Sequence, residues 1–269
     1  MSKTPVLFRY PGGKFYALKL LSNFWGVTHD EYREPFVGGG SVFFAKNKVA
    51  ENWLNDIDEE LITTYDNVKS PDTRKELIKS FSEEVANKER WREVFESKPK
   101  NQFEVARKYF YLNRTSFSGK LVSPAWGYRP KRSLPPERWH ERIKPCGIKL
   151  EDVKLTSVDF EKVILEKSDK EVLMFVDPPY YKPAKKKHYR HGFVKEDHER
   201  LAKALQKTEH KFFLTYEDCQ EVRDLYEWAF IHEVKFFYRV DNSNTENGAR
   251  KMGFELIITN YKLPQTKLF

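Results

Sequence analysis

Five consecutive residues in the last third of the chain, Asp177-Pro178-Pro179-Tyr180-Tyr181, combine groups that could hold a planar ring. They directly follow the apolar run 172–176, which predicts a strand buried on both faces. Prolines fix the backbone and lack an N–H donor, so the carbonyl of Pro178 can accept from a ligand amine. Asp177 is a second acceptor and Tyr180 offers a stacking face. This pattern predicts a socket for a nucleobase bearing an amino group, although a proline-rich turn is the simpler interpretation.

A second cluster, Glu34-Pro35-Phe36-Val37-Gly38-Gly39-Gly40-Ser41, places three glycines between a predicted strand and a predicted helix. Glycine lets the backbone turn tightly and approach a ligand closely. Asp56 ends the next predicted strand, near the ~20-residue spacing at which an acidic residue binds the ribose hydroxyls of a nucleoside cofactor. Together these residues predict a cofactor site. Taken singly, the turn could be an ordinary connection and Asp56 a solvated cap.

Both clusters need a framework that brings strand ends together. The sequence predicts strands at 32–36, 51–55, 154–158, 172–176, 212–216 and 255–261, and helices at 18–25, 42–45, 59–69, 73–81, 88–95, 103–113, 196–206 and 217–228. Strands alternating with helices favour a largely parallel sheet with helices on both faces. Ser41 is expected to cap the second helix. The charged, mostly helical stretch 59–149 interrupts this pattern and predicts an insertion between the parts 1–58 and 150–269 of a catalytic domain.

Composition narrows the functional class. The 269 residues include 48 Lys and Arg against 40 Asp and Glu, a net charge of +8, and 15% are aromatic. The aromatic content excludes wholesale disorder, and a basic, aromatic-rich chain favours nucleic acid as partner. No stretch approaches the roughly 18 apolar residues that span a bilayer, and no signal-like segment opens the chain. We therefore expect a cytoplasmic protein without a membrane partner, in which Cys146 and Cys219 are free thiols.

Four motifs in a fixed order make the chain resemble the Dam-type (D12 class, α-group) DNA N6-adenine methyltransferases. They are YPGGK (10–14), EPFVGGGSVFF (34–44), NRTSFSG (113–119) and FVDPPYY (175–181). The resemblance implies an α/β, Rossmann-like S-adenosylmethionine-dependent methyltransferase sheet, with a mostly helical target-recognition domain inserted at 59–149. It also implies S-adenosyl-L-methionine as cofactor, no metal, and methylation of a flipped adenine in double-stranded DNA. We expect a monomer or a weak dimer.

The same resemblance implies roles for individual residues. Asp177, Pro178 and Tyr180 would hold the target adenine. Cofactor contacts would come from Tyr10, Lys14, Phe36, Gly38, Gly40, Asp56, Asp159 and Phe160. In this scheme Asp56 binds the ribose hydroxyls, and Asp159 with Phe160 flanks the cofactor's adenine. Asp159 could equally cap the helix that follows it.

Cations and aromatic residues gather in two stretches, 113–132 and 182–190. Such loops can place arginine on guanine edges, insert an aromatic ring into the base stack and contact phosphates. The predicted DNA contacts are Arg114, Phe117, Lys120, Trp126, Arg129, Lys131, Arg132, Lys185, Lys186 and Lys187. GATC is the leading target implied by the family. The short stretch SPAWGYRP (123–130) departs from the longer hairpin of the best-known GATC enzymes, so the recognition sequence stays open.

Other functions fit parts of the sequence. An RNA or cytosine-N4 methyltransferase would share the DPPY motif, and a non-catalytic DNA-binding protein would explain the charge but not the glycine turn with Asp56. The dipeptide Pro145-Cys146 is similar to the nucleophile of cytosine-C5 methyltransferases, yet no buried strand precedes it. His188 and His191 have no ligand-spaced partners and are assigned to the basic loop, so we expect no metal site.

Overall fold

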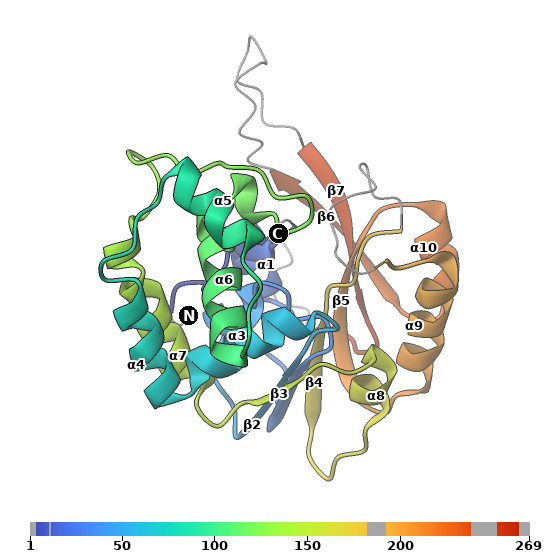
Figure 1. Ribbon diagram of the computed structural model, residues 1–269. Helices are drawn as coiled ribbons and strands as arrows, with labels where there is room; N and C mark the ends of the chain where they lie inside the picture. The colour runs from blue at the N-terminus through green and yellow to red at the C-terminus, as the bar shows by residue number, and fades with distance from the viewer. Residues whose placement is uncertain (1–3, 11, 182–191, 238–251, 264–269) are drawn as a thin grey trace.

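The centre of the protein is a seven-stranded sheet with the strand order β3-β2-β1-β4-β5-β7-β6 (Figure 1). The computed structural model describes residues 4–10, 12–181, 192–237 and 252–263. The strands are β1 (Glu31–Glu34), β2 (Glu51–Asn55), β3 (Lys154–Thr156), β4 (Val172–Val176), β5 (Lys211–Glu217), β6 (Phe230–Phe237) and β7 (Met252–Thr259). The five strands β1 to β5 pair in parallel, and β7 runs antiparallel to both of its neighbours.

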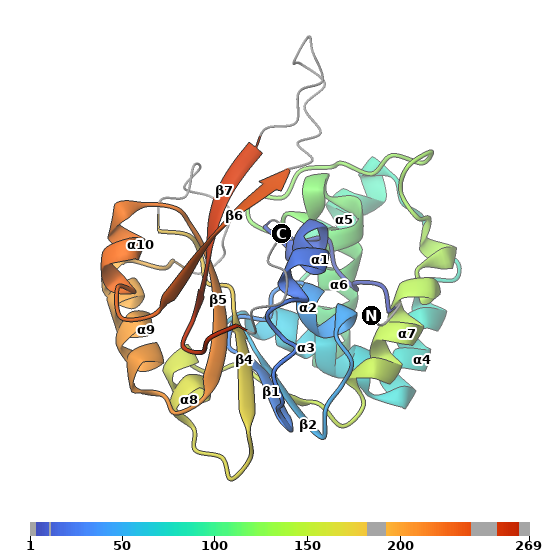
Figure 2. The same cartoon turned by 180° about the vertical axis from the view of Figure 1, so that it is seen from behind.

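Helices cover both faces of this sheet, as predicted. They are α1 (Leu18–Leu21), α2 (Ser41–Ala45), α3 (Glu59–Lys69), α4 (Pro71–Ser80), α5 (Lys88–Glu96), α6 (Gln102–Thr115), α7 (His140–Leu150), α8 (Phe160–Leu165), α9 (Lys195–Lys207) and α10 (Gln220–Leu225), with short 3-10 helices η1 (Lys14–Ala17), η2 (Phe117–Gly119) and η3 (Pro136–Arg138). Helices α8, α9 and α10 lie on one face, and α1, α2 and α3 lie on the other, as the two opposite views show (Figures 1 and 2). None of the described helices is both long and apolar enough to cross a membrane.

The alternation of side chains along β4 explains the two layers. Leu173 and Phe175 enter the core shared with α1, α2, α3, α6 and α7, whereas Met174 and Val176 enter the core shared with α8, α9 and α10. Successive residues of a strand point to opposite faces, so a central strand covered on both sides must be apolar throughout. The strand predicted from the apolar run 172–176 is therefore confirmed, with the same bounds.

Connectivity places the functional motifs together. From β1 the chain moves to β2 and then β3 on one side, and it returns to pair β4 on the other side of β1. Ligands of open α/β sheets bind at such a switch point, outside the carboxyl ends of the strands. The glycine turn follows the carboxyl end of β1, and Asp177 follows that of β4. The topology alone thus brings both motifs to one edge.

The stretch 59–149 packs closely against the sheet. Helix α3 contacts α6 and α7, and the buried rings of Tyr65, Phe110 and Trp139 belong to the same core as Leu54 of β2 and Phe175 of β4. The division of the chain into a catalytic domain and an inserted recognition domain stays a prediction, because one continuous core runs through both parts.

Several elements differ from expectation. Ser41 does not cap α2: Gly40 occupies the capping position with a left-handed φ of 64°, and Ser41 is the first helical residue without a capping hydrogen bond. Helix α10 is shorter than predicted at both ends: Glu217 belongs to β5, and the helix ends at Leu225. The sequence did not indicate α7, whose Pro145 and Gly147 are normally poor helix formers, nor β6.

Candidate active site

A pocket lies at the carboxyl ends of β1, β2 and β4, where the sheet's switch point predicts it. It is lined by Tyr10, Gly12, Gly13, Lys14, the turn 36–41, the segment 56–58, Phe175, Asp177, Pro179, Gly192 and Phe193. Most of the residues predicted from the family motifs to bind the cofactor, together with Asp177, therefore surround one hollow. Which ligand each of them contacts stays a prediction.

The glycine turn forms one wall of this pocket. Gly38 has φ of 46°, and a Cβ atom there would lie 3.0 Å from Cε1 of Tyr10. Gly40 has φ of 64°, and a Cβ atom there would lie 2.9 Å from Cε2 of Phe44. Side chains are strained at such φ values and have no room here, so only glycine lets the backbone line the pocket.

Asp56 holds the turn in place. Its two carboxylate oxygens accept hydrogen bonds from the backbone N–H groups of Gly38 (2.9 Å) and Asp58 (3.1 Å). The hydroxyl of Tyr65 donates to the carbonyl of Gly38 (2.8 Å), and the Asp58 side chain caps α3 by accepting from the N–H of Leu61. Asp56 is thus a structural acceptor for the turn, and its contact with ribose hydroxyls stays a prediction.

Beside the glycine turn, three motif residues meet. The buried ammonium group of Lys14, 2% exposed, lies 2.7 Å from Oδ1 of Asp177 and donates to the hydroxyl of Tyr180 at 2.9 Å. The same ammonium group lies 4.8 Å from the centre of the Tyr180 ring. Thr215 of β5 donates its hydroxyl to Oδ1 of Asp177 at 2.7 Å. Sequence analysis gave Lys14 to the cofactor alone, whereas the structure joins it to the DPPY motif.

Glu34 is a buried carboxyl group close to this cluster. Burial raises its pKa to about 8, and the negative charge of Asp177 adds to the shift, although the hydroxyl of Tyr32 donates to Oε1 at 2.7 Å. Sequence analysis quoted Glu34 only as part of the glycine motif. Thr215 carried no sequence signal, because it lies within an apolar strand pattern.

Asp159 and Phe160 line a neighbouring hollow that shares Phe36, Ile57, Gly192 and Phe193 with the first. The rings of Phe160 and Phe36 are 5.4 Å apart. Asp159 caps α8 by accepting from the N–H of Glu161, and its carboxylate forms an ion pair with Arg200 at 3.0 Å. The capping role that was the alternative for Asp159 is therefore present, and a contact with the cofactor's adenine stays a prediction.

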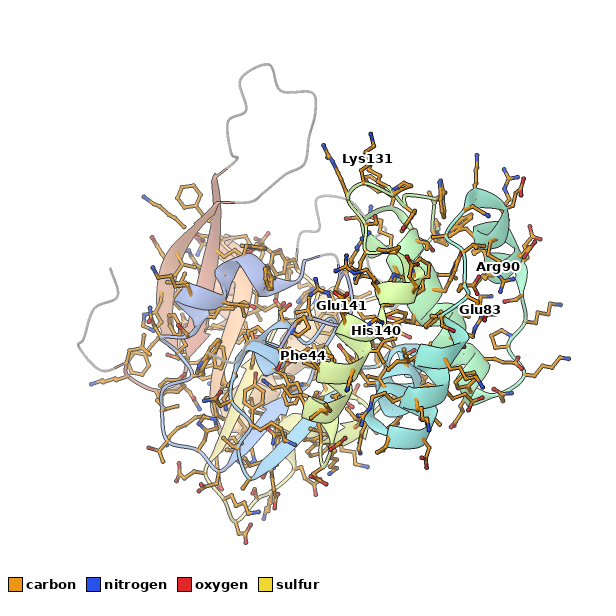
Figure 3. The ribbon with its side chains drawn as sticks, turned by 90° about the vertical axis from the view of Figure 1, so that its left-hand side faces the viewer. Phe44, Glu83, Arg90, Lys131, His140 and Glu141 are labelled. Carbon is orange, nitrogen blue, oxygen red and sulfur yellow. The ribbon has the colours of Figure 1, made fainter. Side chains whose placement is uncertain are left out.

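The loop that follows α6 carries the expected DNA-binding side chains. An isolated bridge pairs Ser116 with Trp126. Phe117 is 56% exposed; Arg129, Lys131 and Arg132 are exposed, and Lys120 and Trp126 are half-buried. Lys131 points away from the body of the protein (Figure 3). Lys185, Lys186 and Lys187 lie outside the described residues.

Arg114 has a different environment. It is only 6% exposed, and its buried Nε atom has no hydrogen-bond partner. Burial, followed by the charges of Arg9 and Arg142, lowers its pKa to about 9. Sequence analysis treated Arg114 as one cation of an open loop, but it lies at the end of α6 with its side chain in the protein interior.

Among the described residues, no group of three or more His, Cys, Asp and Glu side chains is arranged to hold a metal ion. Cys146 is buried in α7, donates to the carbonyl of Pro5, and has a pKa raised by burial, so it is not placed as a nucleophile.

Comparison with known proteins identifies the family of the chain. The chain is 26% identical over 261 residues to the type II methyltransferase M.CviBI of Paramecium bursaria Chlorella virus NC1A, covering 95% of this chain and 99% of that relative. It is 25% identical over 276 residues to M1.LlaDCHI of Lactococcus lactis, covering 94% of each chain. It is 29% identical over 264 residues to M.MjaIII of Methanocaldococcus jannaschii, covering 86% and 88%. The family model for D12 class N6 adenine-specific DNA methyltransferases matches residues 10–240, and the chain belongs to this family.

Proposed function

We propose that the protein transfers a methyl group from S-adenosylmethionine to N6 of a specific adenine in double-stranded DNA. The observation that carries this proposal is the contact of Lys14 with both Asp177 and Tyr180, directly beside the glycine turn and Asp56. An acceptor, a stacking ring and a nucleoside pocket are thus adjacent. The family and its type II relatives support a site-specific DNA substrate.

The pocket residues fit S-adenosylmethionine. A carboxylate (Asp56) and a glycine turn without room for a Cβ atom are the features that bind a nucleoside closely. In this proposal Asp56 binds the ribose hydroxyls, and Phe36, Gly38 and Gly40 line the methionine side. Tyr10 and Lys14 contact the adenosyl and methionine ends of the cofactor, and Asp159 and Phe160 flank its adenine. When bound, the cofactor would supply a sulfonium methyl group: the nitrogen lone pair forms the N–C bond as the S–C bond breaks, S-adenosylhomocysteine leaves as a neutral thioether, and the nitrogen loses one proton to solvent.

The DPPY residues would prepare the target amine. The N6 group of adenine is buried by pairing and stacking in a duplex, so the base must first leave the helix. Asp177 and the carbonyl of Pro178 accept from N6–H, which turns the lone pair toward the methyl group. Tyr180 stacks on the extruded ring, an interaction worth roughly 1–3 kcal/mol per base. Positioning and fixed dipoles then account for catalysis without a covalent intermediate or a metal.

The loop after α6 would read the DNA. Exposed Arg129, Lys131 and Arg132 are suited to phosphate and base-edge contacts, and the exposed ring of Phe117 is suited to insertion between bases. One copy of the chain holds every residue to which this proposal assigns a role, which supports action as a monomer or a weak dimer. The proposed place of action is the cytoplasm, where the DNA is. GATC is the first target to test.

A methyl-transfer assay with an Asp177→Asn variant tests the proposal. Asparagine keeps the size of the side chain but loses the negative acceptor, so turnover should fall by about 100-fold or more, with cofactor and DNA affinities within about threefold of wild type. Asp169→Asn, on the loop before β4, is the matched control. Modified bases should be mapped by single-molecule sequencing in cells that lack adenine methylation. Methyl groups on cytosine N4 or on RNA, or an active Asp177→Asn enzyme, would contradict the proposal.

A further inference from the structure

A histidine outside the pocket contacts Phe193, which lines the pocket, and Tyr181, which ends the DPPYY motif. His198, in the first turns of α9, is 2% exposed. The centre of its ring lies 4.8 Å from that of Tyr181 and 4.6 Å from that of Phe193, the latter edge-on at 83°. Tyr181 directly follows Tyr180, and Phe193 lines both hollows of the site. One imidazole ring thus packs against the end of the DPPYY motif and against the wall of the cofactor pocket.

The polar side of the same ring points at β5. Nδ1 of His198 lies 2.5 Å from the hydroxyl oxygen of Tyr216, a fully buried residue. Burial lowers the pKa of His198 to about 4 and raises the pKa of Tyr216 above its ordinary value. Both groups are therefore neutral near pH 7, and the Tyr216 hydroxyl can donate to Nδ1.

Tyr216 links this pair to the proposed base socket. Its ring lies 6.3 Å from the ring of Tyr180, and its neighbour Thr215 donates to Asp177 at 2.7 Å. A displacement of Tyr216 would therefore also displace Tyr180, the proposed stacking ring, and Asp177, the proposed acceptor. An ordinary core histidine would satisfy only its own hydrogen bond. Here every ring that the imidazole packs against belongs to, or adjoins, the proposed site.

We propose that His198 is a positioning residue: it holds Tyr181 and Phe193 against one ring and, through its hydrogen bond to Tyr216, fixes Tyr180 relative to the cofactor pocket. This inference rests on the proposed function for its kinetic consequence. Misplacement of reacting groups by about 1 Å is costly because the aligned geometry itself lowers the barrier. The ring contacts should therefore affect cofactor binding, and the hydrogen bond should affect turnover.

Two substitutions separate these parts. His198→Phe keeps an aromatic ring but loses the hydrogen bond to Tyr216, and Tyr216→Phe removes the same bond from the other side. Each should lower kcat by about 10-fold with the KM for the cofactor within about twofold, and the double variant should be no worse than either single variant. His198→Asn keeps a polar atom near the position of Nδ1 but loses the ring against Phe193. It should raise the cofactor dissociation constant by about fivefold and retain more of kcat than His198→Phe.

His232→Phe is the matched control, because His232 packs against Phe24 in the other core. Thermal unfolding of each variant shows whether it folds, and Tyr216→Phe, the mildest change, carries the test if His198→Phe does not fold. Losses of kcat that multiply in the double variant, or an unchanged cofactor affinity in His198→Asn, would overturn the inference. Cofactor affinity is measured by calorimetry without any turnover. If the wild type methylates no adenine, the proposed function fails. The positioning role of His198 is then still tested by the cofactor dissociation constant of His198→Asn.

Discussion

The ammonium group of Lys14 lies 2.7 Å from Oδ1 of Asp177, which joins the first motif of the chain to the last. The hydroxyl of Thr215 reaches the same oxygen at 2.7 Å. Both donors meet the same oxygen and so orient the carboxylate; in the proposed reaction the second oxygen, Oδ2, accepts from the target amine. The arrangement explains how an acceptor can be fixed before any DNA binds, which is what preorganised catalysis requires.

Removal of the Lys14 charge should therefore disturb catalysis more than binding of DNA. In Lys14→Met the apolar stem remains, but Asp177 loses its ion pair and Tyr180 loses a hydrogen-bond donor. We expect kcat to fall by about 100-fold, as when one preorganised electrostatic group is removed. Lys19→Met, an exposed change of the same charge nearby, should leave kcat unaltered. Single-turnover methyl transfer measures both; a Lys14→Met enzyme with normal kcat would show that the ion pair is irrelevant to the reaction.

Asp56→Ala should weaken cofactor binding and also destabilise the fold. The substitution leaves the N–H groups of Gly38 and Asp58 without their acceptor, and a lost acceptor for buried donors costs roughly 1–3 kcal/mol of unfolding free energy. We expect the cofactor dissociation constant to rise by at least about 10-fold, the equivalent of about 1.4 kcal/mol. Calorimetry and urea unfolding measure the two effects, with exposed Asp72→Ala as control. Unchanged cofactor affinity would remove Asp56 from the binding site.

Local sequence patterns predicted much of the framework. Strands β2 and β4 and helix α3 have the bounds expected from their apolar runs and charged flanks. These elements carry their own signal, because a strand covered on both faces must be apolar and a capped helix begins after an acidic residue such as Asp58.

Features that depend on tertiary contacts were not predictable. The pairing of Lys14 with Asp177 joins the first motif to the last, far apart in the sequence, and no local pattern encodes it. Helix α7 forms despite Pro145 because buried Ile143, Cys146 and Leu150 pack against α3, which outweighs propensity. The burial of Arg114 likewise follows from packing and not from the open, basic composition of its neighbourhood.

Glu34 should make stability depend on pH in a direction unusual for a carboxyl group. Its pKa in the folded state is about 8, above the ordinary value of 4.5, so the folded protein keeps a proton that the unfolded chain loses. Its contribution to stability is full below pH 4.5 and is lost as the pH rises through 8. Glu34→Gln cannot ionise, so the melting temperature of this variant should improve relative to wild type between pH 5 and 9. Calorimetric scans across that range decide this, and a constant difference between the two proteins would contradict it.

Arg129 and Arg114 should respond differently to substitution. Arg129 is exposed, so Arg129→Ala should leave stability unchanged while it weakens DNA binding. The slope of the logarithm of DNA affinity against the logarithm of salt concentration should become shallower by about one, or the preference at one base pair should relax.

Arg114 is buried beside other positive charges with Nε unpaired, so Arg114→Met should raise the unfolding free energy by about 1–3 kcal/mol. If Arg114 also contacts DNA, affinity should fall despite that gain. Fluorescence anisotropy at several salt concentrations and urea unfolding separate these effects; a destabilised Arg114→Met protein would show that the guanidinium is a structural necessity.

Substitutions of Tyr180 separate its ring from its hydroxyl. Tyr180→Ala removes the stacking surface, worth roughly 1–3 kcal/mol, and turnover should fall by about 10- to 100-fold. Tyr180→Phe keeps the ring but removes the oxygen that accepts from Lys14 at 2.9 Å, so a smaller loss of about 2- to 10-fold is expected. Tyr180→Trp also keeps a stacking face. With 2-aminopurine at the target position, fluorescence reports extrusion of the base; Phe and Trp should retain the extruded state better than Ala. Equal turnover in the Ala and Phe variants would mean that the ring does not hold the target base and that its contact with Lys14 is the part that matters.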